Sequence, residues 1–135
     1  GFGSCGQFSL IDIGATEAVE RDLEGSSSVE GGQVLAEFAD VKSAKRTYAV
    51  LRAWHDNCAA DSDDVASSKL TEEVAVTDGT GHAYLVTGND AQEFEGVALT
   101  RVGKRISVLL VESDGIAWPS PDPAVAAVKA AAARL

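Results

Sequence analysis

One amphipathic segment limits the folds open to this chain more than any other feature, the run VLAEFADVKSAKRTYAVLRAWHDNC at residues 34–58. Val34 to Phe38 reads as a strand, and Asp40 is a suitable N-cap for the helix that follows. On a helical wheel, the apolar side chains, the imidazole of His55 and the thiol of Cys58 lie within an arc of about 140°. The residues of this arc are Val41, Ala44, Tyr48, Leu51, Trp54, His55 and Cys58. Lysines, arginines and other polar residues occupy the opposite face. The pattern predicts a helix that lies on a sheet with Trp54 inward.

Two strand pairs are predicted in the second half of the chain. Glu95 to Val102 and Arg105 to Glu112 flank Gly103-Lys104, a pair suited to a type II′ hairpin turn with glycine at the positive φ. The nearly continuous apolar run at 106–111 predicts a central strand. Thr71 to Thr77 and His82 to Thr87, on either side of DGTG, predict a second hairpin.

The chain ends are predicted from caps and composition. Phe8 to Ile13 reads as a short strand or apolar anchor, with Phe8 and Leu10 inward. Ala15 to Leu23 is predicted to be helical, followed by a loop over Gly25 to Gly32 and, beyond the central helix, by an exposed acidic loop over Ala59 to Ser68.

Near the C-terminus, Ser120 or Asp122 can cap a last helix over Ala124 to Leu135, with Pro123 at its start and a stripe of Val125, Val128 and Leu135. The sum predicts an α+β fold, with an antiparallel sheet of about five or six strands and about three helices packed on it. A chain of 135 residues suggests one domain. We expect residues 1–32 to form an N-terminal strand, helix and loop, and residues 33–135 to form the core.

Composition excludes some classes of partner. The net charge of −10 opposes nucleic acid and anionic lipid, because both require a basic surface. No apolar run approaches the roughly 20 residues of a membrane span, so we expect no transmembrane segment here, which leaves room for a membrane tether outside these residues.

The two cysteines, Cys5 and Cys58, leave two alternatives open. A bridge would close a loop of about 54 residues and stabilise the fold by about 4 kcal/mol in the chain-entropy model. Two buried thiols in a reducing cell are the other reading. The positions of the two cysteines favour the bridge, because a covalent link near the terminus at Cys5 would hold that end to the helix that Cys58 closes.

Sites for chemistry are few. His55 and Cys58 share a helix face and could form a nucleophile pair or two metal ligands. Asp61, Asp63, Asp64 and Glu72 have part of an EF-hand spacing, but Val65 and Ala66 occupy two positions where that loop needs an oxygen ligand and glycine. Strand carboxylates Asp12, Glu37 and Glu112 could serve a hydrolase. We expect no metal site and no cofactor.

Several larger side chains could line a cleft, although core packing is the more frequent role of aromatic residues. These are Tyr48, Trp54, Tyr84 and Trp118. With Arg101 in place of Trp118, they form the set of ligand-binding residues that we expect, Tyr48, Trp54, Tyr84 and Arg101.

The segment VLAEFAD followed by VKSAKRTYAVLRAWHDNC, with Ala44, Trp54 and Cys58, resembles the strand and A…W..C helix of PknH-type extracellular sensor domains. These occur in actinobacterial receptor kinases and in related lipoproteins. VALTRVGKRISVLLVESDG and DPAVAAVKAAAARL are similar to the closing hairpin and helix of that family, so the resemblance covers about residues 33–135. It implies an α+β domain outside the cytoplasmic membrane, a cleft on an antiparallel sheet, a small ligand and no catalysis.

The resemblance also assigns Trp54 to the helix tryptophan and Cys58 to a disulfide. The family often has its second cysteine at the start of the penultimate strand, where this chain has Phe94-Glu95-Gly96, so Cys58 must pair with Cys5 or with nothing. We therefore expect an extracytoplasmic, non-enzymatic sensor or small-ligand-binding domain, whose partner is an unknown small molecule or protein. The alternatives are a secreted protein–protein interaction module without a small-molecule pocket and, third, a small hydrolase.

Overall fold

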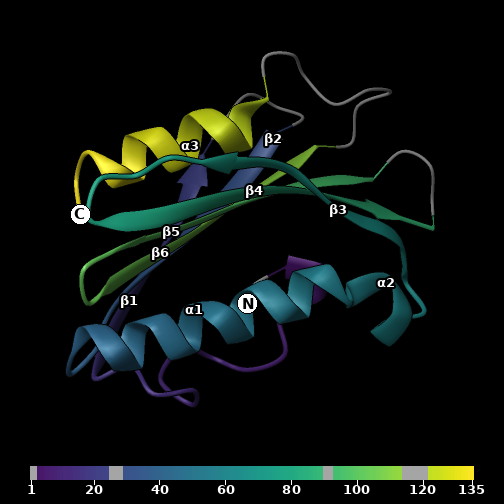
Figure 1. The fold of residues 1–135 in the computed structure, drawn as a ribbon. Helices are drawn as coiled ribbons and strands as arrows, with labels where there is room; N and C mark the ends of the chain where they lie inside the picture. Colours follow the sequence, from purple (N-terminus) through teal and green to yellow (C-terminus); the bar gives the residue numbers. More distant parts are fainter. Residues whose placement is uncertain (1–2, 25–28, 90–92, 114–121) are drawn as a thin grey trace.

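The computed structural model describes residues 3–24, 29–89, 93–113 and 122–135 (Figure 1). Its core is a sheet of six antiparallel strands in the spatial order β1-β2-β6-β5-β4-β3. The strands are β1 (Glu17–Glu24), β2 (Val29–Glu37), β3 (Val65–Val74), β4 (Gly79–Gly88), β5 (Phe94–Val102) and β6 (Arg105–Ser113). Among these residues the helices are a short 3-10 turn η1 (Gly3–Cys5), α1 (Val41–Asp56), α2 (Cys58–Asp61) and α3 (Pro123–Ala132). The predicted α+β fold is confirmed.

The helices cover both faces of the sheet. α1, α2 and the N-terminal segment lie on one face, and α3 lies on the other (Figure 1). Because successive side chains of a strand point to opposite faces, β6 sends Ile106, Val108 and Leu110 into the core under α1, whereas its neighbours Ser107 and Leu109 face the α3 side. None of the helices in the described part of the chain has the length and apolar content to cross a membrane.

α1 follows the predicted helix closely. The carboxylate of Asp40 accepts a hydrogen bond from Ser43 N at 2.7 Å, as an N-cap does. The aromatic and aliphatic face is buried, and only 8% of Trp54 is exposed. Val41, expected on this face, is 43% exposed, so the prediction that it packs inward is wrong. The helix ends at Asp56, so that Cys58 begins α2 instead of closing α1.

A disulfide fastens the N-terminal segment beneath α1. Cys5 and Cys58 are bonded, with their Cα atoms 5.4 Å apart, and both side chains are buried. The ring of Phe8 lies against that of Trp54, with centroids 6.2 Å apart. The residues around Phe8 form turns and no strand; Leu10 is buried as expected, whereas Phe8 is 59% exposed and the prediction that it points inward is wrong.

The predicted helix over Ala15 to Leu23 is wrong, since this segment is β1. Each of its residues from Glu17 to Glu24 pairs with one from Glu37 to Glu30 in β2. Alanine, glutamate, arginine and leucine favour a helix locally, but pairing with β2 satisfies the backbone and overrides that preference. The predicted loop over Gly25 to Gly32 is also too long, because β2 begins at Val29; residues 25–28 lie outside the described part.

Two further boundaries differ from the prediction. The acidic stretch over Ala59 to Ser68 is not a loop throughout, because it includes α2 and the start of β3, where Val65 is buried. Asp61 therefore ends a helix and Glu72 lies in a strand, which is incompatible with a single calcium loop. The β5–β6 hairpin is as predicted, and Gly103 has φ of +56°. The β3–β4 hairpin exists, but β3 ends at Val74 instead of Thr77 and β4 begins at Gly79, within the predicted turn.

α3 begins as the sequence predicts. Asp122 accepts a hydrogen bond from Ala124 N at 2.9 Å, and Pro123 occupies the first turn; Ser120 and Trp118 lie outside the described residues. Of the predicted stripe, Val128 is fully buried, while Val125 and Leu135 are half-buried, and Leu135 lies beyond the end of α3 at Ala132. The core under α3 is built from small side chains: Val74, Ala83, Ala98, Ala124 and Val128.

Candidate functional site

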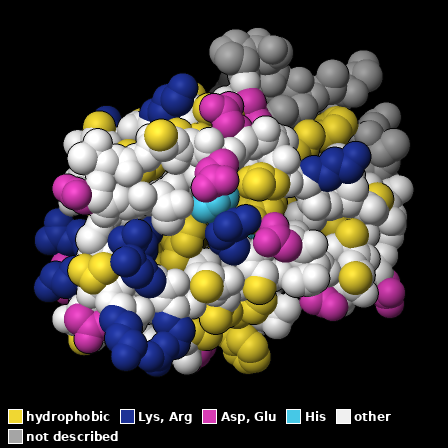
Figure 2. Space-filling view, in the orientation of Figure 1, with side chains coloured by type: hydrophobic (Ala, Val, Ile, Leu, Met, Phe, Trp, Pro, Cys, Tyr) yellow, Lys and Arg dark blue, Asp and Glu magenta, His cyan; other side chains and the backbone are white. Residues whose placement is uncertain are grey.

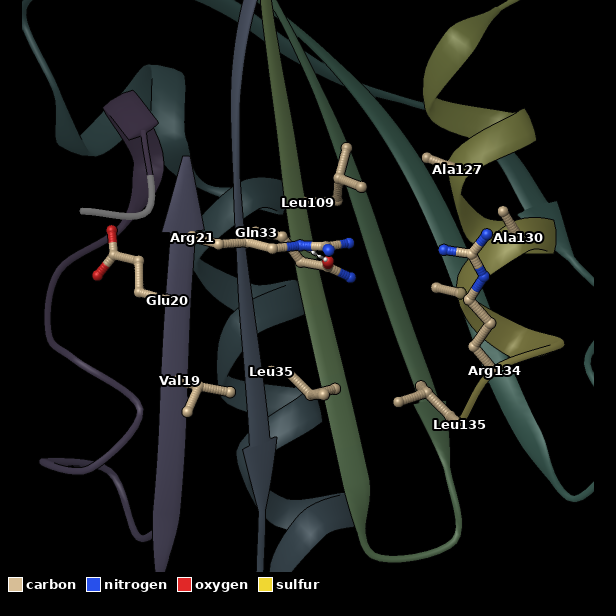
Figure 3. A pocket seen from close by; sticks show the side chains of 11 residues that line it. Val19, Glu20, Arg21, Gln33, Leu35, Leu109, Ala127, Ala130, Arg134 and Leu135 are labelled. Carbon is tan, nitrogen blue, oxygen red and sulfur yellow. Dashed lines mark hydrogen bonds between the residues drawn. The ribbon is translucent and has the colours of Figure 1, made fainter. Parts of the chain in front are cut away.

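A groove opens where α3 stops covering its face of the sheet. α3 packs mainly on β4 and β5, with fewer contacts to β6 and β3, so β1 and β2 extend beyond it on the same face. The space between is a groove of about 420 Å³, a size typical of small-molecule sites (Figure 3). We call it the α3 groove. The strands supply Val19, Arg21, Gln33, Leu35 and Leu109, and the helix end supplies Ala127, Ala130, Arg134 and Leu135.

Most of the α3 groove is apolar. Val19 and Leu35 are cross-strand partners that form one end of its floor, and Leu135 faces them from beyond α3 (Figure 3). Val19 is 60% exposed, and Leu35 is also exposed. Leu109 and the alanines of α3 form the other end. Exposed aliphatic side chains that meet across a concave surface provide area that a ligand could bury.

A polar row crosses the middle of this floor. Arg21 Nε donates to Gln33 Oε1 at 2.9 Å, and Gln33 Nε2 donates to Ser107 Oγ at 2.9 Å. These bonds fix the amide of Gln33 and direct the guanidinium of Arg21 along the sheet toward α3 (Figure 3). Arg134 brings a second guanidinium from the opposite wall. Glu20 also borders the groove, but its carboxylate points away from α3.

The groove therefore has a positive character in an acidic protein. In the described part of the chain, three other basic side chains are paired with carboxylates: Arg52 with Asp56 at 3.8 Å, and Lys104 and Arg105 with Glu37 at 2.8 and 3.1 Å. The α3 groove thus combines an apolar floor with two guanidiniums that form no ion pair with a carboxylate of the described residues.

The four residues expected to bind a ligand lie on the other face of the sheet, under α1. Tyr48 and Arg101 line a shallow depression between α1 and β4–β5, where Figure 2 shows a histidine side chain among basic and acidic ones. Tyr84 lies beneath its edge, and Trp54 lies apart, beside the disulfide. The structure brings Tyr48, Tyr84 and Arg101 to one region and leaves Trp54 out of it; their role toward a ligand stays a prediction.

These polar groups are engaged within the protein. The Tyr48 hydroxyl donates to the Leu99 carbonyl oxygen at 3.0 Å and lies 2.7 Å from His82 Nδ1. Because a hydroxyl has one proton, His82 Nδ1 is the donor in this pair. Burial lowers the pKa of His82, which favours its neutral form. Arg101 donates to the Gly103 carbonyl oxygen at 3.0 Å.

Tyr84 is held in a similar way. Its hydroxyl donates to Asp56 Oδ1 at 2.7 Å and accepts from Arg52 Nε at 3.4 Å. Burial raises the pKa of Tyr84 to about 12, so the hydroxyl keeps its proton at neutral pH. This network cross-links α1 to β4 and leaves little hydrogen-bonding capacity for a ligand.

The other predicted sites for chemistry find no support in the geometry. Cys58 is bonded to Cys5 and cannot supply a thiolate, and His55 is buried with Nδ1 bonded to the Leu51 carbonyl oxygen at 2.8 Å. The described side chains contain no cluster of three or more His, Cys, Asp or Glu residues able to hold a metal ion.

The strand carboxylates do not form an acid–base pair. Glu37 and Glu112 lie on opposite faces of the sheet, seven residues apart along β6, or about 23 Å. Hydrogen bonds from Lys104 and Arg105 lower the pKa of Glu37, which suits an ion pair better than an acid. Asp12 accepts from Ser9 Oγ in a surface turn.

No protein-family model matches the sequence, and no curated protein is similar to it. The site is therefore defined by its geometry. Sequence reasoning missed the residues of the α3 groove, because Arg21 falls in a segment predicted to be helical and Gln33 directly follows a predicted loop. Ala18, Val19, Glu20 and Arg21 do not alternate between apolar and polar, so the sequence of this segment carries no local signal for a strand.

Proposed function

We propose that this chain is a non-enzymatic, extracytoplasmic sensor or ligand-binding domain, whose small ligand occupies the α3 groove. The observation that carries the proposal is the groove itself, an apolar concave floor crossed by a row of fixed polar groups. Pockets of this composition bind small molecules by burying apolar surface while a few polar groups set the orientation.

The Cys5–Cys58 bridge supports a place outside the cytoplasm, because disulfides persist in oxidising compartments. The resemblance of residues 33–135 to PknH-type extracellular sensor domains points the same way. A lack of catalysis agrees with the loss of Cys58 as a nucleophile and with the burial of His55.

A second candidate function is a protein–protein interaction module that binds through β1. This strand is an edge of the sheet, and three large apolar side chains near it are more than half exposed: Phe8, Ile11 and Val19. Edge strands offer unpaired backbone groups to an extended partner. A partner that adds a strand here would not require the α3 groove.

Mapping of ligand contacts by NMR separates the two. We expect small molecules that combine an apolar body with one polar group to shift the amide signals of Gln33, Leu35, Ala127 and Ala130. Shifts confined to Tyr48, Tyr84 and Arg101 would move the site to the α1 face and contradict the proposal. No shifts with small molecules, combined with peptide-induced shifts at Phe8, Ile11 and Val19, would favour the interaction module.

A further inference from the structure

We propose that the ligand of the α3 groove is an amphipathic anion, an apolar molecule that carries one carboxylate. The inference rests on the proposed function and adds the chemical class of the ligand. Its basis is the position of Arg21 and Arg134 on opposite walls of an apolar groove, in a chain whose net charge is −10.

The two guanidiniums have hydrogen-bond donors left for a ligand. Arginine presents several N–H donors in a planar fork that matches a carboxylate, and Arg21 uses only its Nε toward Gln33. Among the described residues, no acidic side chain pairs with Arg21 or Arg134. The remaining donors of both side chains are therefore available to an anion that enters the groove.

The arrangement of polar and apolar groups sets the orientation of the ligand. The register pairs Arg21 with Gln33 and, two residues along, Val19 with Leu35. In Figure 3 the guanidinium of Arg134 lies level with Arg21 and Gln33, and Leu135 lies level with Val19 and Leu35. A carboxylate between the arginines thus leaves the apolar body of the ligand over Val19, Leu35 and Leu135.

Two electrostatic features of the protein restrict where the carboxylate can lie and what kind of ligand can bind. The carbonyl end of α3 is near Leu135 and is the negative end of the helix dipole, so the carboxylate belongs beside Arg21 and Gln33 rather than at that end. The overall acidity repels a membrane surface made of anionic lipid. The ligand is accordingly a free small molecule, not a bilayer.

The test compares ligands that share an apolar body and end in either a carboxylate or a hydroxyl group. Titration of the protein with decanoate and decan-1-ol, and with 2-naphthoate and 2-naphthylmethanol, gives Kd values from NMR shifts at Gln33 and Ala130. We expect at least one carboxylate to bind about tenfold more tightly than its matched alcohol, as charge-assisted hydrogen bonds predict. Arg21→Gln and Arg134→Gln should each weaken carboxylate binding by about three- to tenfold and leave alcohol binding unchanged.

Lys129→Gln is the matched control, because Lys129 is exposed on α3 and does not border the groove. The substitution removes one positive charge, as Arg21→Gln and Arg134→Gln do. It should leave both affinities unchanged. Equal binding of acid and alcohol in both pairs, or equal losses in all three variants, would overturn the inference while the proposed function stands. If none of the four compounds shifts Gln33 or Ala130, both the inference and the proposed function are wrong.

Discussion

At the scale of single residues, Glu95 is the one buried carboxylate among the described residues, with 6% of its surface exposed. Its oxygens accept hydrogen bonds from Ser4 N at 3.1 and 3.2 Å, next to the Cys5–Cys58 bridge. Burial, with a smaller contribution from the charge of Glu112 across the β5–β6 ladder, raises the pKa of Glu95 to about 7. The hydrogen bonds from Ser4 oppose this shift without cancelling it.

This shift predicts how stability depends on pH. The folded protein holds the proton of Glu95 more tightly than the unfolded chain, so Glu95 lowers the free energy of unfolding as pH rises from about 4.5 to about 7, and has no further effect above that. The expected loss is about 3 kcal/mol. Glu95→Gln should flatten this part of the profile, measured by urea unfolding at pH 5, 6, 7 and 8. The same slope in both proteins would contradict the assignment.

At the scale of elements, features fixed by neighbouring residues could be predicted and features fixed by distant ones could not. Asp40 and Asp122 cap their helices as expected, and Gly103 turns its hairpin, because each acts within a few residues. β1 was predicted as a helix because its composition favours one. Only pairing with β2 makes it a strand, and a single sequence does not reveal that pairing.

The packing of β2 against β6 gives a test at this scale. A Cβ atom on Gly31 would lie 2.8 Å from the Leu110 carbonyl oxygen, closer than such contacts allow, whereas one on Gly32 would lie 3.8 Å from its nearest neighbour. Gly31→Ala should therefore lower the free energy of unfolding by about 1–3 kcal/mol. Gly32→Ala, its control in the same strand, should change it by less than about 1 kcal/mol. Equal effects in urea unfolding would show that the β2–β6 spacing is different.

At the scale of the whole molecule, the two faces of the sheet differ in what fills them. The α1 face holds the larger side chains, including Phe38, Leu51 and Tyr84, and packs them fully. The α3 face holds alanines and valines, and α3 covers only part of it. The predicted cleft was placed on the α1 face, whereas the apolar α3 groove lies on the opposite face. The sequence could not reveal this groove, because the position of α3 relative to β1 depends on tertiary packing.

Ligand binding after the α3 groove has been filled shows directly whether the groove is the ligand site. Ala130 is exposed and borders the groove, so Ala130→Phe should place a ring in the groove beside Leu109 without disturbing the core. Ala126→Phe adds the same ring to α3 at an exposed position outside the groove. With the compound that the unmodified protein binds best, we expect Ala130→Phe to abolish the NMR shifts at Gln33 and Ala126→Phe to retain them. Unchanged affinity in Ala130→Phe would show that the ligand binds elsewhere.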